Sequence, residues 1–93
     1  MTNEVLDKIS QNILDAVPGI ATDSMTYVHL EYIPGRNEVY GKFMSDGGQH
    51  DDPNGVAFRT YLNELGIPLK DTPSGQIRSF LVNARDLDLL FNR

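Results

Sequence analysis

The residues best suited to chemistry lie in one glycine-rich loop. His50 is followed by Asp51 and Asp52, and Asp46 stands just upstream. Imidazole and carboxylate groups at this density could wrap a hard cation or move a proton. The segment lacks the Asp-x-Asp-x-Asp-Gly spacing of a calcium loop. We therefore expect a surface loop whose last acid caps a helix, with a metal-assisted or acid–base enzyme at His50 as an alternative.

A second pair of functional groups, His29 and Glu31, alternates along a strand-like segment. Side chains two residues apart on a strand share a face, so these two could form an acid–base pair or two metal ligands. The plainer interpretation is a solvated outer face, and we expect no cofactor. The chain has no cysteine, and it has no Walker loop, nucleophile elbow or His-Glu-x-x-His motif. These absences argue against an enzyme.

The strand-like segment belongs to a predicted antiparallel hairpin. Residues 25–33 and 38–44 alternate in polarity on either side of a turn at 34–37. The turn begins Pro-Gly, and we expect Gly35 to supply the positive φ of a type II turn. A turn of this length sets the residues that flank it opposite each other and thereby fixes the whole register.

This register gives the hairpin two different faces. One face is apolar and pairs Val28 with Phe43, Leu30 with Gly41, and Tyr32 with Val39. The other face is mixed and mostly polar, and it includes Glu31, Glu38 and Tyr40. Since an antiparallel sheet can cover a core with one face only, we expect the mixed face to meet solvent or a partner.

Helical patterns flank the hairpin on both sides. Apolar residues recur at three- and four-residue steps over 2–17, with Thr2 or Asn3 as a cap and Pro18-Gly19 as the stop. A second helix is expected from Pro53 to residue 65, although alternation over 56–65 also fits a strand. Its predicted buried residues are Val56, Tyr61, Leu62 and Leu65, with Phe58 at the edge.

The last twenty residues fit two patterns. Either residues 76–82 form a third strand and Asn83 caps a short helix, or one long helix begins at Pro73. We favour the strand followed by a helix, because a two-stranded sheet alone is marginal. The sequence thus predicts one α+β domain over residues 1–93, with an N-terminal helix, a hairpin that a third strand extends, and helices packed on one face.

Charge is unevenly distributed along the 93 residues, which carry 13 acidic and 8 basic side chains for a net charge of −5. Residues 1–52 hold nine acids against three bases, a net of −6, and residues 53–93 hold four against five, a net of +1. We expect no direct nucleic-acid binding, which depends on Lys and Arg. No apolar run approaches the ~20 residues that cross a bilayer. No secretory signal is evident, so we expect a cytoplasmic protein with no membrane partner.

Acidity combined with tyrosines favours a binding role. We expect a small non-enzymatic protein of the immunity, antitoxin or inhibitor kind that neutralises a basic partner, such as a toxin or a nucleic-acid-processing protein. Tyr27, Tyr32 and Tyr40 would add aromatic anchors. A homodimer through exposed strand edges is a further alternative. The expected partner-binding residues are Glu31, Glu38, Tyr40, Asp46, Asp51 and Asp52.

Overall fold

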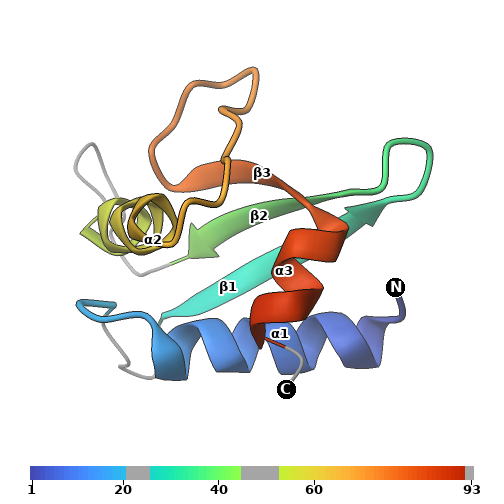
Figure 1. The fold of residues 1–93 in the computed structure, drawn as a ribbon, viewed down its shortest axis with the longest axis horizontal. Coiled ribbons are helices and arrows are strands. Elements are labelled where there is room, and N and C mark those ends of the chain that lie inside the picture. The colour runs from blue at the N-terminus through green and yellow to red at the C-terminus, as the bar shows by residue number, and fades with distance from the viewer. Residues whose placement is uncertain (21–25, 45–52, 92–93) are drawn as a thin grey trace.

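The structure, a computed structural model, describes residues 1–20, 26–44 and 53–91. These residues form one antiparallel sheet in the order β1-β2-β3 together with three helices (Figure 1). The α+β class is confirmed, and so is the third strand ahead of a short C-terminal helix. The elements are α1 (Asn3–Ala16), β1 (Tyr27–Ile33), β2 (Glu38–Met44), α2 (Pro53–Glu64), β3 (Ser79–Asn83) and α3 (Ala84–Phe91).

The first helix begins and ends where the sequence predicts. The Oγ1 atom of Thr2 accepts a hydrogen bond of 3.3 Å from the Val5 amide, which satisfies one of the free donors of the first turn. Beyond the helix, Gly19 has a φ of +87°, which a residue with a Cβ adopts only at a cost. One stripe of the helix is buried, and it consists of Leu6, Ile9 and Ile13.

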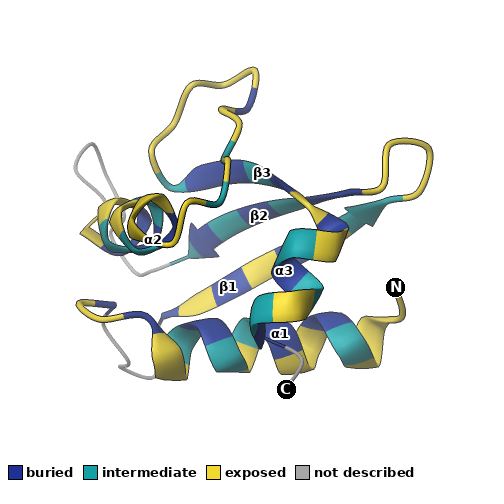
Figure 2. Ribbon diagram, in the orientation of Figure 1, coloured by how far each residue is buried: buried dark blue, intermediate teal, exposed yellow. Residues whose placement is uncertain are grey.

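The hairpin register is the predicted one, from Ile33 opposite Glu38 to Tyr27 opposite Met44. Burial alternates along β1, as Figure 2 shows. Val28 and Leu30 are buried, whereas the side chains between them reach solvent. The apolar face therefore covers the core.

The prediction for the turn was wrong in one respect. The residue with positive φ is Asn37, at 51°, and not Gly35. The Arg36 amide donates to the Ile33 carbonyl at 3.2 Å, so the chain turns tightly first and enters the left-handed region only afterwards. Asn tolerates that region better than most residues. Here its Oδ1 accepts a hydrogen bond of 2.9 Å from the Tyr32 hydroxyl.

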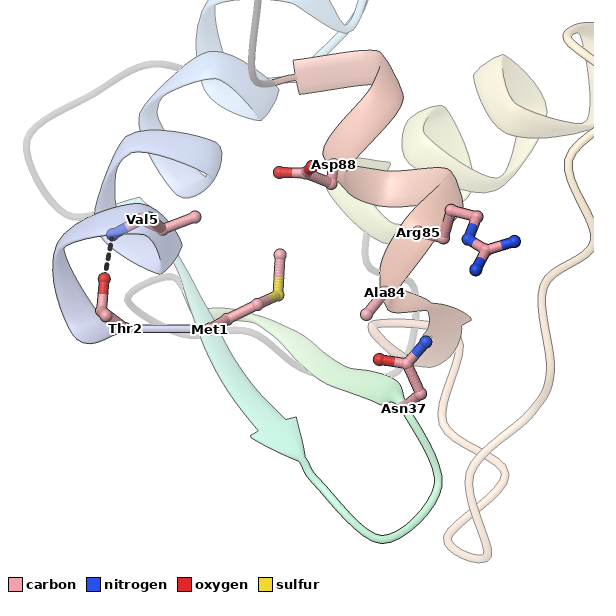
Figure 3. Close-up of a pocket in the computed structure, with 7 residues that line it drawn as sticks. All are labelled: Met1, Thr2, Val5, Asn37, Ala84, Arg85 and Asp88. Atoms are coloured by element: carbon pink, nitrogen blue, oxygen red, sulfur yellow. Dashed lines mark hydrogen bonds between the residues drawn. The ribbon is translucent and has the colours of Figure 1, made fainter.

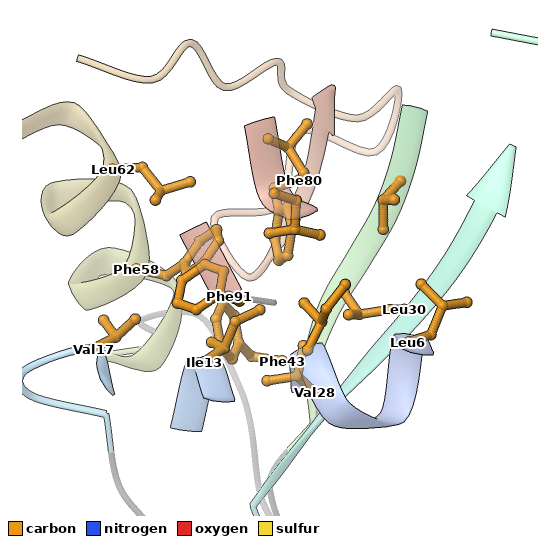
Figure 4. Packing of buried hydrophobic residues seen from close by; sticks show 14 of the residues in the cluster. Leu6, Ile13, Val17, Val28, Leu30, Phe43, Phe58, Leu62, Phe80 and Phe91 are labelled. Carbon is orange, nitrogen blue, oxygen red and sulfur yellow. The ribbon is translucent and has the colours of Figure 1, made fainter. Parts of the chain in front are cut away.

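The core lies between the sheet and all three helices, which pack on the same face of the sheet as predicted (Figure 4). Its centre holds Phe43, Phe58 and Phe80, whose ring centroids lie 4.5 to 5.8 Å apart. Such pairs of tilted rings add attraction beyond the area that they bury. The ring of Phe80 lies over Gly41, where a Cβ would stand 2.1 Å from the ring.

The segment after the hairpin is a helix, α2, and not a strand. It buries Leu62 and partly buries Tyr61 as predicted, but the rest of its buried stripe differs from the predicted one. Phe58 is fully buried, while Val56 and Leu65 are 48% and 47% exposed. The cause is the close approach of Gly55 to the chain ahead of β3, where a Cβ would lie 2.7 Å from the Ile77 carbonyl oxygen. This contact turns the helix so that Phe58 points into the core. The predicted cap, Asp52, lies outside the described residues.

The chain between α2 and β3, residues 66–78, forms a strap along the outer edge of β3 (Figure 1). It starts with Gly66, which has a φ of +76° and donates its amide to the Asn63 carbonyl. The Ile67 amide reaches back to the Leu62 carbonyl at 3.0 Å, and together these bonds form a Schellman helix end. The backbone of Lys70 then pairs with Leu81 through two hydrogen bonds of 2.9 Å.

Helix α3 is fixed to the hairpin turn at its first residue. The Ala84 amide donates to the Asn37 carbonyl at 3.0 Å, and the Oδ1 of Asn83 accepts from the Arg85 amide at 2.9 Å. Asn83 therefore caps the helix as predicted.

Candidate functional site

The face of the sheet opposite the helices has no helix over it among the described residues. We call this surface the open face. Because side chains alternate along a strand, its members follow from the register of the three strands. Its exposed or half-exposed residues are Tyr27, His29, Glu31 and Ile33 from β1, Tyr40, Lys42 and Met44 from β2, and Leu81 and Asn83 from β3.

Tyr40 occupies the middle of the open face. It stands between Glu31 on β1 and Leu81 on β3, and it is half-buried by its neighbours. The Glu31 side chain is 65% exposed, and its Oε1 lies 3.1 Å from the Nε2 of His29. The sheet thus brings together Glu31 and Tyr40 from the predicted set and adds Tyr27, which is 54% exposed.

Glu38 differs from the other described members of the predicted set, because its carboxylate is buried and already paired within the protein. The residue is only 5% exposed, and its Oε2 accepts a hydrogen bond of 2.6 Å from the Nζ of Lys70 in the strap. The Nε of Arg36 lies 3.1 Å from the other carboxylate oxygen, in an ion pair without hydrogen-bond geometry. The bond from Lys70 lowers the pKa of Glu38 below its usual value, against the opposing effect of burial.

The remaining predicted residues Asp46, Asp51 and Asp52 lie outside the described residues, as does His50. Their partner-binding role and the alternative metal or acid–base role of His50 stay predictions. Within residues 1–20, 26–44 and 53–91, no group of three or more His, Asp and Glu side chains is arranged to hold a metal ion.

Two further features of the sheet were not anticipated, one on its covered side and one on the open face. Tyr32 belongs to the covered side of the sheet, where its hydroxyl is bonded to Asn37, so it is not an exposed anchor. Lys70 and Arg36 bring two positive charges to the end of the face near the turn. Lys70 comes from 32 positions beyond Glu38, and no local sequence pattern links the two.

Acidic side chains gather on the other side of the molecule, along α1 and α3. They are Glu4, Asp7, Asp15, Asp86 and Asp88, and the neighbouring bases are Lys8 and Arg85. Among the described residues, the open face is thus nearly balanced in charge, while the helical side is net negative.

A groove of about 490 Å³ lies where the starts of α1 and α3 meet the hairpin turn (Figure 3). Much of its polar lining is already bonded within the protein: Thr2 caps α1, and Asn37 is held by Tyr32 and Ala84. The charged groups that line it are Arg85 and Asp88. This lining holds no nucleophile paired with a base.

Comparisons with protein-family models, with curated proteins and with solved structures found no match for this chain. None of the helices in the described ranges is long and apolar enough to cross a bilayer.

Proposed function

We propose that this chain is a non-enzymatic binding protein that docks a basic protein partner on the open face of its sheet. The observation that supports the proposal is an uncovered sheet surface with Tyr40 at its centre and Tyr27 and Glu31 exposed beside it. The partner class is that of a toxin or a nucleic-acid-processing protein, which an inhibitor of the immunity or antitoxin kind would neutralise. A cytoplasmic location is part of the proposal, and the cysteine-free composition fits it.

The chemistry of the face suits protein recognition. Tyrosines provide large contact areas with few rotatable bonds, and they are enriched among residues that dominate binding energy. Glu31 can accept two parallel hydrogen bonds from an arginine of the partner, which is the stronger kind of ion pair. Half-exposed Leu81 adds apolar surface beside Tyr40, and half-exposed Met44 adds it beside Tyr27.

Long-range electrostatics adds a second contribution. The net charge of −5 attracts a basic partner from a distance and raises the rate of encounter, an effect that falls with salt. The short-range contacts of the open face then determine how long the complex lasts, since truncating buried contacts changes mainly the dissociation rate.

The test is affinity capture with the immobilised chain from an extract of its own cells, followed by kinetics with the purified captured protein. We expect to capture a basic protein that binds the unaltered chain. Its rate of association with the chain should fall as the salt concentration rises. Tyr40→Ser and Glu31→Lys should each weaken binding about tenfold or more. Neither residue is fully buried, so folding should be preserved, and circular dichroism checks this.

The matched control is Asp7→Lys, which makes the same charge change as Glu31→Lys on the exposed side of α1. It should lower the association rate modestly and leave the dissociation rate unchanged. A captured protein that is acidic, or one whose dissociation is insensitive to both changes on the open face, would overturn the proposal.

A further inference from the structure

The two edges of the sheet differ in how their backbone groups are satisfied. At β3, the Ser79 amide donates to the Gln76 carbonyl at 3.1 Å, and the Ser79 carbonyl accepts from the Nη2 of Arg59 at 2.6 Å. The outward amide and carbonyl of Leu81 both pair with Lys70. The strap and α2 therefore close this edge to any further strand.

At β1, the outward backbone groups find no such partners among residues 1–20, 26–44 and 53–91. The Phe43 amide donates to the Arg78 carbonyl. The backbone amides and carbonyls of Phe43 and of every second residue of β2 therefore point toward β3. Their opposite residues on β1, which are Val28, Leu30 and Tyr32, must then direct their amides and carbonyls away from the sheet. Over the described part of the chain, no hydrogen bond is found for these outward groups.

We infer that a second copy of this chain pairs along β1, antiparallel and with Leu30 on the two-fold axis. This register makes hydrogen-bonded pairs of the residues whose backbone groups point outward, as an antiparallel ladder requires. On the open face it sets His29 opposite Glu31 of the second copy and Tyr27 opposite Ile33. Each copy thus supplies both members of a complementary pair, as a two-fold interface demands.

Charge selects this register over its neighbours. A shift by two residues in one direction sets Glu31 opposite Glu31, and a shift in the other direction sets His29 opposite His29. Two carboxylates directly opposite each other repel, and two histidines gain no opposite charge, whereas a histidine and a carboxylate attract or share a hydrogen bond. Within one copy the two side chains already lie 3.1 Å apart, and both are about half exposed or more, so each can turn toward the neighbouring strand.

The dimer joins two three-stranded sheets into one six-stranded sheet with a continuous open face. A single pair of seven-residue strands is a small interface, so the association is weak and concentration-dependent. The inference is independent of the proposed basic partner, because it is measured on the purified chain alone.

The experiment is sedimentation equilibrium from about 10 µM to about 1 mM chain, the range in which small interfaces associate. We expect a monomer–dimer equilibrium. His29→Glu, which sets two carboxylates opposite each other, should weaken the dimer about tenfold or more. The double variant His29→Glu/Glu31→Lys restores opposite charges and should return the dimer to within about threefold of the unaltered chain. Asp7→Lys serves as a charge-matched control, with an effect within about threefold.

Amide hydrogen exchange then locates the interface. Raising the chain concentration should slow the exchange of the Val28, Leu30 and Tyr32 amides. The exchange rates of the His29 and Glu31 amides, which point toward β2, should not change. A chain that remains monomeric across the range would overturn the inference. So would a dimer that the double variant fails to restore, or one that protects other amides instead.

Discussion

Gly41 is required by the aromatic ring that lies over it. A Cβ at this position would meet Phe80, which is 1% exposed and packed against Phe43 and Phe58, so the ring has no free space to enter. We expect Gly41→Ala to lower the free energy of unfolding by about 1–3 kcal/mol, the usual cost of overpacking a core. Urea unfolding measures it. The control is Gly35→Ala, where nothing lies within 4 Å, and a cost as large as that at Gly41 would contradict the argument.

Glu38 should make the stability of the fold depend on pH. Its folded-state pKa is lowered from 4.5 mainly by the hydrogen bond from Lys70, so folding favours the ionised form. The resulting stabilisation is complete above the ordinary pKa and is lost as the pH falls through the lower folded value. Between about pH 6 and about pH 3, the unaltered chain should therefore lose more stability than Glu38→Gln in urea unfolding. Parallel pH profiles for the two proteins would contradict this assignment.

At the scale of elements, Arg59 of α2 holds the strap in place. Its guanidinium donates to the carbonyls of Ile77 and Ser79 at 3.0 and 2.6 Å, and it lies 2.9 Å from a carboxylate oxygen of Asp71. Arg59→Met should cost about 1–3 kcal/mol, because the carbonyls of Ile77 and Ser79 lose their donor and the bond to Ser79 is partly buried. Proteolysis within 66–78 should also become faster. Asp71→Asn removes only an exposed ion pair and should cost less than about 0.5 kcal/mol, so equal effects of the two changes would reject this role of Arg59.

The elements that could be predicted are those in which several local signals agree. The hairpin register followed from alternation and turn length together, and α1 followed from its cap, its apolar stripe and its Pro-Gly stop. The buried stripe of α2 was predicted only in part, at Leu62 and Tyr61, since Gly55 of that helix meets backbone more than twenty residues away, which no local pattern shows. For the same reason the pairing of Glu38 could not be predicted, because the lysine that neutralises it, Lys70, comes from the strap.

At the scale of the whole molecule, the sequence states the charge bias directly, but only the fold shows on which side the acids lie. The sequence assigns most acids to the first half of the chain, yet folding sends three of them to the outer side of α1. The open face keeps Glu31 as its exposed carboxylate within the described residues, beside tyrosines and Lys42. Encounter with a basic partner and contact with it are therefore expected to depend on different sides of the protein.

The strap along β3 has a consequence for how the chain behaves in a crowded solution. A sheet with two bare edges can add copies without limit, and this is the geometry from which filaments and amyloid grow. Here Lys70 and Arg59 occupy one edge, so a strand that joins at β1 has no second site through which to propagate. We therefore expect that pairing at β1, as inferred above, stops after one addition and does not lead to fibres.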